Sequence, residues 1–245
     1  METAKTRRTI RRYRADDVPQ ELLNELLETA CRASTCGNMQ LYSVVATRDA
    51  AVREALSPAH FNQPMVKQAP VVLTFCADLR RFSLWCEARR ATPGYGNLQS
   101  FMNAAMDTLI LAQTFAMLAE EAGLGICYLG TTTYCPQDII RVLGLPRLVF
   151  PVTTLTVGYP DEYPAQTDRL PLEAVLHADT YHDYRPEDID AYFSYKESLP
   201  ENQRFVQENH KQTLAQVFTD IRYTRSDNEA MSANLLDVLR RQGLL

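Results

Sequence analysis

The sequence predicts an α+β fold, and three observations lead to this class. Helix-like and strand-like segments alternate without regular βαβ units, and no GxGxxG motif follows a strand, which argues against a Rossmann domain. The continuous apolar run APVVLTFCAD (69–78) is typical of a strand buried on both faces. The run from 98 to 125 is apolar nearly all round between Ala104 and Ala119 and ends near Gly123, which predicts a long buried helix.

Three further elements are predicted before residue 60. DDVPQELLNELLETACRAS (16–34) opens with acidic residues and Pro19, and its leucines recur at helical spacing. LYSVVATRD (41–49) contains a β-branched run that predicts a strand. A short helix is expected through AAVREAL (50–56).

Three more elements follow the long helix. ICYLG (126–130) predicts a short strand. CPQDIIRVLGL (135–145) has a proline near its start and a glycine near its end, which predicts a short helix. VTTLTVGYP (152–160) alternates as a half-buried strand does and ends in a turn.

The composition changes after about residue 180. The stretch 180–212 is polar and tyrosine-rich, whereas NEAMSANLLDVLRRQGLL (228–245) regains a helical pattern. An arm that ends in an amphipathic helix packs on its own core or on a partner subunit. We therefore divide the chain into a core, 1–182, and a C-terminal arm with a terminal helix, 183–245, which contributes to the dimer and the substrate site.

Composition and charge exclude several classes of partner. The net charge is −5 over 245 residues, so no global positive field attracts nucleic acid or anionic lipid. The opening METAKTRR has no apolar signal region, and no stretch of 18 uncharged apolar residues follows. The six cysteines form no CxxC pair and no metal-ligand spacing. We expect a cytoplasmic protein with no metal site, no nucleic-acid partner and no membrane contact.

Against this acidic background, RRTIRRY (7–13) concentrates four arginines in seven residues. If the segment is extended, Arg7, Thr9 and Arg11 share one face, and the intervening residues share the other. Two guanidinium groups that flank a hydroxyl suit a phosphate or another planar anion. A solvated basic N-terminus is the simpler alternative.

Three other stretches present polar groups at places where a ligand can reach them. ASTCGNMQ (33–40) lies between a predicted helix and a strand and is rich in small polar residues. YLGTTT (128–133) places a glycine and three threonines at the end of an apolar strand, where backbone amides become free to bind. TDRLPLEAVLH (167–177) presents Arg169 in a loop bounded by proline.

Taken together, these stretches resemble the nitroreductase family of flavin enzymes, in particular its NADPH-flavin oxidoreductase and oxygen-insensitive nitroreductase subgroup. The resemblance covers about residues 5–182 well and the final arm loosely. The matching pieces are RRTIRRY, STCGNMQ, EEAGLGICYLG, LGLPRLVFPVTTLTVGYP and DRLPLEAVLHADTY.

The resemblance implies a nitroreductase-like α+β fold, with a central mixed β-sheet surrounded by helices around the long buried helix. It also implies a homodimer with two FMN molecules at the subunit interface and a C-terminal arm that wraps the partner subunit. The polar arm and the apolar helix that ends at Gly123 agree with both expectations.

The resemblance further implies which residues bind FMN. Arg7, Arg8 and Thr9 would lie along the phosphate and the ribityl chain. Arg169 would close on the phosphate, and Arg11 would reach the N1/C2=O edge of the flavin. The other implied contacts are Thr35, Gln63, Tyr128, Leu129, Gly130 and Thr131, with an amide near Gly130 or Thr131 donating to N5.

The implied function is an FMN-dependent NAD(P)H oxidoreductase of nitroreductase or flavin reductase type. A ping-pong cycle would pass hydride from NADPH or NADH through flavin N5 to a nitroaromatic, quinone or flavin acceptor. No catalytic acid or base is expected, because hydride leaves N5 directly and protons can come from water. Arg11 would act as an electrostatic stabiliser of the reduced flavin. The alternatives are a non-enzymatic FMN or anion-binding module, and a reductive dehalogenase or flavin-consuming enzyme on the same fold.

The chain departs from the family pattern at two positions. Thr167 stands where the subgroup commonly has a second basic residue, so Arg8 or Arg12 would have to compensate. Thr133 stands where relatives carry an arginine that faces the substrate. The physiological acceptor and the preference between NADPH and NADH therefore stay open. Four basic residues of the arm are candidates either for the NADPH 2′-phosphate or for a solvated surface: Arg204, Lys211, Arg222 and Arg225.

Overall fold

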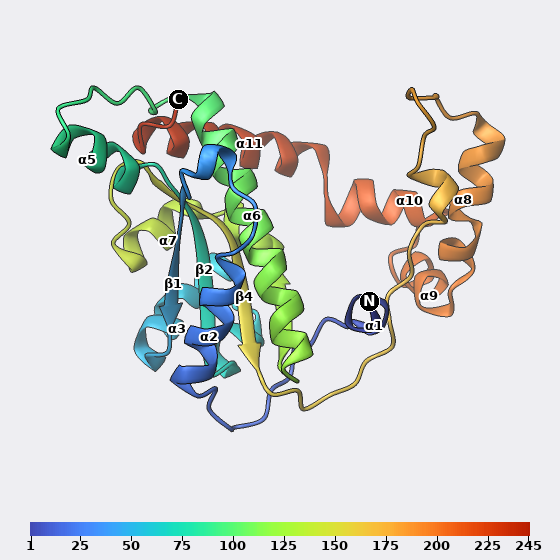
Figure 1. Ribbon diagram of the computed structural model, residues 1–245. Coiled ribbons are helices and arrows are strands. Elements are labelled where there is room, and N and C mark those ends of the chain that lie inside the picture. The colour runs from blue at the N-terminus through green and yellow to red at the C-terminus, as the bar shows by residue number, and fades with distance from the viewer. The chain divides into compact units, whose positions relative to one another are not determined.

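Four strands form the sheet at the centre of the fold, in the order β1-β2-β4-β3 (Figure 1). They span Tyr42–Thr47 (β1), Val71–Asp78 (β2), Gly125–Leu129 (β3) and Val149–Gly158 (β4). The computed structural model, which describes all 245 residues, confirms the α+β class. Every neighbouring pair of strands is antiparallel, so the sheet formed by one chain is not the mixed sheet that we expected, because strand direction alternates across it.

The two central strands are buried along nearly their whole length. All eight residues of β2 are buried, as the continuous apolar run predicts. The prediction that the region of β4 is half-buried is wrong, since only Val152 of this strand is not buried. Phe75 pairs with Thr153 and Cys76 with Pro151, so Val152 is an extra residue in a bulge. A proline is tolerated at such a bulge because it has no amide hydrogen to donate.

Two helices cover one face of the sheet, α2 (Gln20–Ala30) and α6 (Leu98–Glu121) (Figure 1). Gly123 follows α6 with φ +80°, the left-handed conformation that ends helices. The shared core consists of apolar residues from both helices and from the strands, among them Leu23, Leu26, Leu111, Phe115, Leu73 and Phe75.

Shorter helices cover the opposite face. They are α3 (Ala50–Leu56), η2 (Ser57–His60), α4 (Pro64–Gln68) and α7 (Pro136–Leu143). Cys127 and Leu129 of β3 pack here, whereas Ile126 between them faces the core under α6. The alternation along β3 therefore places its residues in two different cores.

A third core lies where the C-terminal end of the chain packs against the sheet. Here Val238 and Leu239, near the end of α11 (Arg225–Arg241), pack with Ala77 and Phe150 of the sheet. The remaining helices of this part are α1 (Glu2–Thr6), η1 (Cys36–Asn38), α5 (Arg80–Ala88) and η3 (Gly130–Thr133).

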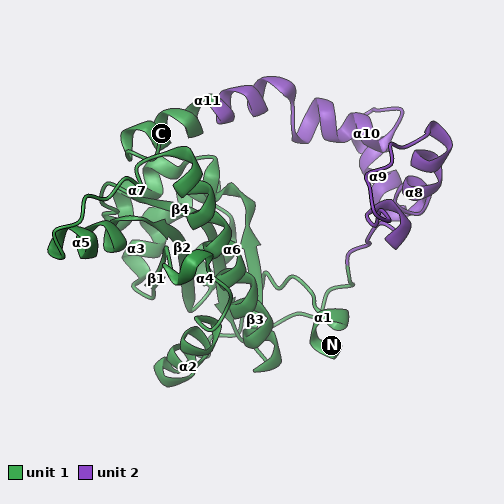
Figure 2. Cartoon of the chain, turned by 45° about the horizontal axis from the view of Figure 1, so that its top comes forward, with its two compact units in different colours: residues 1–166, 233–245 green, residues 167–232 purple.

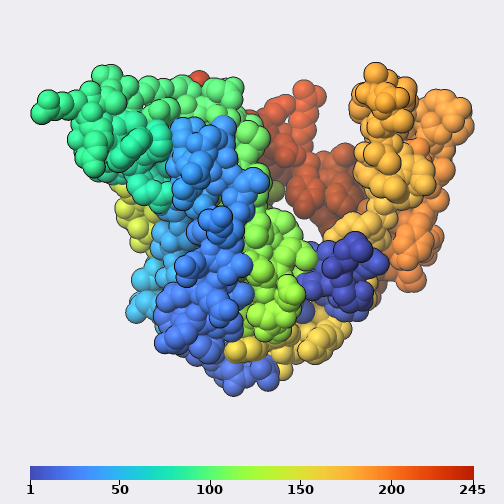
Figure 3. Space-filling model, in the orientation of Figure 1, coloured from blue at the N-terminus to red at the C-terminus, as the bar shows by residue number.

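One face of α6 is apolar but not buried. Met102, Met106, Leu109 and Ile110 are each between 44% and 49% exposed, and their spacing places them along one side of the helix. Figure 3 shows α6 as a green column at the surface of the molecule. By length and composition alone α6 could cross a membrane, but in this structure it packs along the sheet.

The chain divides into two compact units, which Figure 2 colours separately. The core unit comprises Met1–Gln166 and Ala233–Leu245, and the arm unit comprises Thr167–Ser232. The arm unit is also helical within 180–212, a stretch for which the sequence predicted no helix. Its helices are η4 (Leu172–Ala174), α8 (Pro186–Ser198), α9 (Pro200–Glu208), α10 (Leu214–Val217), the π-helical turn η5 (Phe218–Arg222) and the first part of α11.

Candidate functional site

The arginine-rich segment lies along the edge strand β3. The amide of Ile10 donates to the Ile126 carbonyl at 3.0 Å, and Ile10 is buried. A Cβ on Gly125 would lie 2.7 Å from Ile10 Cβ, so this glycine makes room for the segment. Tyr13 forms an isolated bridge with Pro160, and its hydroxyl lies 2.7 Å from Thr156 Oγ1. The sheet therefore fixes the position of residues 7–13 even though they form no strand of their own.

The strict alternation expected for an extended segment does not hold. Ile10 is buried, yet Arg12, which would share its face, is exposed. The physical reason is Glu162, whose Oε1 accepts the consecutive amides of Arg11 and Arg12 at 2.6 and 3.1 Å. Two neighbouring amides of a regular strand point in opposite directions, so a shared acceptor bends the backbone. The Arg12 side chain also pairs with Glu162, at 3.4 Å.

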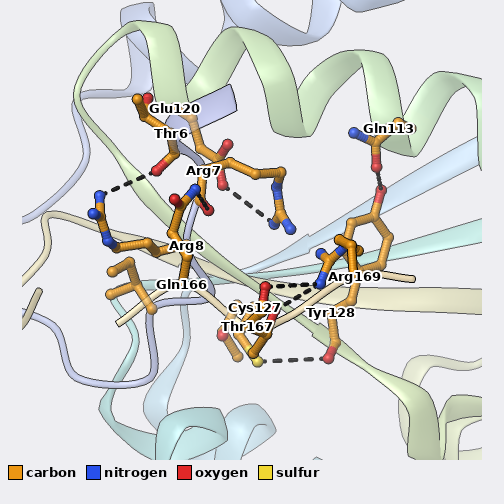
Figure 4. A network of polar contacts seen from close by, with 12 residues as sticks. Thr6, Arg7, Arg8, Gln113, Glu120, Cys127, Tyr128, Gln166, Thr167 and Arg169 are labelled. Atoms are coloured by element: carbon orange, nitrogen blue, oxygen red, sulfur yellow. Dashed lines mark hydrogen bonds and ion pairs between the residues drawn. The ribbon is translucent and has the colours of Figure 1, made fainter. Parts of the chain in front are cut away.

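Arg7 is held against the end of α6 by an ion pair (Figure 4). Its Nη2 lies 3.3 Å from Oε1 of Glu120, a carboxylate that is nearly buried. Burial raises the pKa of Glu120, and the Arg7 guanidinium lowers it in part. Neither Glu120 oxygen has a hydrogen-bond partner, and Arg7 Nε is likewise buried without one. Arg7 and Glu120 therefore attract each other by charge, while Arg7 Nε and both Glu120 oxygens can still form hydrogen bonds.

Arg8 and Arg11 are less constrained than Arg7. Arg8 Nη1 donates to the Thr6 carbonyl at 3.1 Å, at the end of α1 (Figure 4). Thr9 between these arginines is half-buried. Burial raises the pKa of the Cys127 thiol, and Arg11 lowers it in part by its charge and a hydrogen bond. The Arg11 guanidinium therefore lies beside Cys127, the middle residue of β3.

Tyr128 and Leu129 end β3 on opposite faces. The Tyr128 hydroxyl donates to Gln113 Oε1 on α6 at 3.4 Å (Figure 4), and burial raises the pKa of Tyr128 to about 12. Leu129 is buried in the core beneath α7. Gly130 is exposed, and a Cβ there would meet nothing within 4 Å. The backbone thus passes from a packed strand to an open turn at Gly130.

Gln63 and Thr131 are brought together, as the implied site requires. Gln63 Nε2 donates to Thr131 Oγ1 in a long hydrogen bond of 3.5 Å. His60, which the sequence analysis did not single out, lies on the same hydroxyl, with Nδ1 at 2.9 Å. His60 is fully buried, and burial lowers its pKa to about 4, so the imidazole is neutral at physiological pH.

Thr35 lies at a separate place, in the loop that contacts α6. It precedes η1, and the amide of the next residue, Cys36, donates to Asp107 Oδ1 at 2.8 Å. Asp107 is six residues from Gln113, the α6 residue that Tyr128 contacts, which is about 9 Å along a helix. Within one chain, Thr35 makes no hydrogen bond to Gln63 or Thr131.

Arg169 lies in the arm unit, in an exposed loop. Its Nη1 donates to Thr167 Oγ1 at 2.7 Å and to the Asp168 carbonyl at 2.7 Å. The Asp168 side chain in turn pairs with Lys196 of α8 at 2.8 Å. Thr167 thus orients the arginine two residues later, a contact that the sequence analysis, which treated it only as a lost cation, did not foresee.

A cavity of about 360 Å³ opens beside the first arginines. Arg7, Arg8 and Ile10 line it on one side, and Glu120 and Gly125 contribute from α6 and β3. Gln63 and Thr131 do not line this cavity, so the predicted residues of one chain surround no single closed pocket.

Three residues that contact the site had weak sequence signals. Glu162 and Glu120 are ordinary acidic residues in the sequence, and only the fold brings them to the arginines. His60 precedes Gln63 by three residues, but nothing in the local pattern marks it as buried. A helix-period or strand-period pattern reports burial only within regular elements, and these residues lie at ends of elements or beyond them.

Comparison with known proteins places this geometry among characterised relatives. The model of the Nitroreductase family matches residues 4–159. The FMN reductase [NAD(P)H] of Bacillus subtilis is 36% identical over 179 residues, which are 71% of either chain. A crystal structure of a candidate oxidoreductase from Bacteroides fragilis is 68% identical over the whole of both chains, with a TM-score of 0.99. The NfrA1 nitroreductase of B. subtilis is 27% identical with a TM-score of 0.86, covering 99% of this chain and 97% of its own.

Proposed function

Because the chain belongs to the nitroreductase family, as an FMN-dependent NAD(P)H oxidoreductase, we propose that it works by a ping-pong cycle. In this cycle NAD(P)H binds, gives up hydride and leaves before the acceptor takes the same place. The proposed acceptors are nitroaromatics, quinones or free flavin. When bound, FMN supplies the two-electron chemistry, since it accepts and releases hydride at N5.

The residues present fit FMN by their donor chemistry. Arg7 has a buried Nε without a hydrogen-bond partner, which suits an anionic acceptor such as a phosphate. Gly130 has open space where a side chain would stand, so the backbone can approach a flat ring closely. The first amides of a turn such as η3 have no acceptor within the turn, and Gly130 and Thr131 provide them.

We assign the predicted residues to three tasks. Arg7, Arg8 and Thr9 bind the phosphate and ribityl chain, with Arg169 as a further phosphate ligand from the arm unit. Arg11 stabilises the negative charge that reduction places on the N1/C2=O edge. The remaining residues position the ring: Thr35, Gln63, Tyr128, Leu129, Gly130 and Thr131.

The observation that carries the proposal is the placement of the arginine segment against β3. Ile10, Gly125 and Tyr13 fix the segment on the edge of the sheet, and Arg11 lies near Cys127, two residues before β3 ends at Leu129. A merely solvated basic N-terminus needs no such anchoring. The proposed carriers of charge therefore lie along the strand that leads into the proposed amide donors.

We also propose that the protein is a homodimer whose subunits meet on α6. Met102, Met106, Leu109 and Ile110 form an exposed apolar face, and such patches mark interaction surfaces. Thr35 lies by Asp107 on the same helix, apart from the Gln63 cluster. A second copy on α6 gives Thr35 a route to the partner subunit's cofactor, and the arm is proposed to wrap that partner.

We propose that the enzyme is located in the cytoplasm, which supplies NAD(P)H. The four arm cations remain candidates for the 2′-phosphate of NADPH. Arg222 stands out among them because its guanidinium lies 4.4 Å from the Phe205 ring centroid and 5.6 Å from that of Phe218.

An anaerobic spectrum tests the proposed function. Purified protein reconstituted with FMN is expected to show the flavin absorption band, which NADPH or NADH bleaches and a quinone restores. Protein that takes up no FMN would refute the proposal. Protein that binds FMN but is not bleached by either nucleotide would favour the non-enzymatic binding module.

A further inference from the structure

Three segments of the chain meet at one hydroxyl group, that of Thr131. His60, the last residue of η2, lies with Nδ1 2.9 Å from Thr131 Oγ1. Gln63, just before α4, donates its side-chain amide to the same oxygen at 3.5 Å. Thr131 itself belongs to η3 and is 8% exposed. The hydroxyl therefore connects η2, the start of α4 and η3.

His60 is held in a way that core packing alone does not require. None of the surface of His60 is accessible to solvent (0%), and its Nε2 is buried without a hydrogen-bond partner. Burial without a partner is unfavourable for a ring nitrogen. An aliphatic residue would fill the space without that cost, so the hydrogen bond from Nδ1 to Thr131 is the feature that a histidine adds.

The turn between His60 and Gln63 is strained. Phe61 and Asn62 both have φ of 55°, in the left-handed region that non-glycine residues seldom adopt. Two main-chain hydrogen bonds close this turn, from Asn62 to Ser57 at 2.9 Å and from Gln63 to His60 at 3.2 Å. Strained residues of this kind persist only where the surroundings hold them, and they cluster at functional sites.

We propose that His60 is a positioning residue for the cofactor, acting through Thr131 and Gln63. The inference rests on the proposed function, because it assumes that the Gly130 and Thr131 amides face FMN. His60 locks the Thr131 hydroxyl, and the locked hydroxyl fixes both the η3 amides and the Gln63 side chain. In either tautomer the neutral imidazole makes this one hydrogen bond, as donor or as acceptor.

The contact between His60 and Thr131 depends on the Thr131 side chain and not only on the path of the backbone. The hydroxyl that bonds to His60 comes from the threonine at position 131, whereas Gly130 before it has no side chain. A turn anchored by its side chain in a buried histidine presents its amides in one orientation. Such preorganisation improves binding because less freedom is lost when the ligand arrives.

Thr131→Val tests the proposal, since valine keeps the shape of threonine and removes the hydroxyl. The readouts are the Kd of the apoprotein for FMN, followed by flavin fluorescence, the midpoint potential of bound FMN, and the thermal unfolding of the apoprotein. Thr131→Val and His60→Gln are each expected to weaken FMN binding about fivefold or more and to shift the midpoint potential. Thr131→Ser retains the hydroxyl and should bind FMN within about twofold of the wild type.

Two controls make the test specific. Thr47→Val alters another nearly buried threonine on β1, at the opposite edge of the sheet, and should leave FMN binding unchanged. The double variant His60→Gln with Thr131→Val should bind FMN no more weakly than the worse single variant, because one hydrogen bond is lost in all three.

The outcomes separate the two proposals. If Thr131→Val binds FMN with wild-type Kd and potential, His60 is not a positioning residue, although the proposed function stands. Fully additive losses in the double variant overturn the coupling in the same way. If the wild-type apoprotein itself binds no FMN, the proposed function fails and this inference fails with it. Should His60→Gln not fold, the comparison of Thr131→Val with Thr131→Ser still decides.

Discussion

Gly125 of β3 and Gly158 of β4 face each other in the register of the sheet, and the N-terminal segment lies against both of them. A Cβ on Gly125 would lie 2.7 Å from Ile10 Cβ, and one on Gly158 would lie 2.9 Å from Tyr13 Cδ1. Because neither glycine has a side chain, the arginine segment can pack closely against the sheet at this pair.

The first prediction concerns this close approach. Gly125→Ala should destabilise the protein by about 1–3 kcal/mol, because the added methyl overlaps Ile10. Gly94→Ala is the matched control, since a Cβ there meets nothing within 4 Å. Thermal unfolding of both variants measures the difference. Adding Ile10→Gly to Gly125→Ala removes the Cβ that the new methyl overlaps and should relieve the clash. A double variant less stable than both single variants would contradict this explanation.

Arg11 and Arg12 provide a second comparison. Arg11 lies beside Cys127 in the middle of β3, whereas Arg12 pairs with Glu162 and is largely exposed. Arg11→Ala should lower the midpoint potential of bound FMN by about 30–65 mV, the equivalent of one charge-assisted hydrogen bond lost from the reduced form. Arg12→Ala should change it far less. Potentials from anaerobic dye equilibration decide, and equal shifts in the two variants would refute the assignment of Arg11.

A third prediction follows from the buried His60. Its pKa is lowered from 6.5 to about 4 by burial, so between these values the unfolded chain binds a proton that the folded chain does not. Stability is therefore complete above pH 6.5 and should fall by about 3 kcal/mol as the pH drops to 4. Urea unfolding of the wild type and His60→Gln across this range measures the contribution. Parallel pH profiles for the two proteins would show that His60 is not its source.

The exposed face of α6 leads to a fourth prediction. Ile110→Glu should turn the proposed dimer into monomers, because a carboxylate is strongly unfavourable in an apolar interface. Leu84→Glu on α5 changes an apolar residue of similar exposure, 48% against 44%, and should leave the mass in solution unaltered. Sedimentation velocity distinguishes the two states. A wild type that sediments as a monomer at all concentrations would exclude the proposed interface.

The loop of the arm unit permits a fifth test. Thr167→Val removes the 2.7 Å contact with Arg169 Nη1, while Thr167→Ser keeps a hydroxyl in place. FMN binding should weaken about two- to fivefold in the valine variant and stay near wild type in the serine variant, as an exposed hydrogen bond contributes little. Titration of the apoproteins with FMN gives both constants, and identical constants would leave Thr167 without a part in binding.

Regular elements and their order were predictable from the sequence because period and flanking residues report burial locally. The run at 69–78 and the helix that ends at Gly123 are confirmed, as are the helices that open at Gln20 and at Pro136. The half-buried reading of β4 failed because Thr153, Thr154 and Thr156 are buried in a central strand. A threonine pattern does not reveal whether a second layer of helices covers the polar face.

The site was predictable only in part, for a similar reason. Gln63 and Thr131 do meet, and Arg11 does lie beside β3. The residues that hold them, His60 and Glu162, act over long sequence separations from positions outside any periodic pattern. Side chains of that kind become visible only when the fold is known, and the roles of all the assigned residues await the experiments above.

Glu120 is an internal competitor for the positive charge that Arg7 offers. While this carboxylate is ionised, it neutralises part of the positive charge that Arg7 presents to an incoming anion. Because burial raises the pKa of Glu120, mild acidification neutralises that competitor sooner than it would a glutamate on the surface. The affinity for an anion beside Arg7 is therefore coupled to the protonation of Glu120, which does not have to contact that anion.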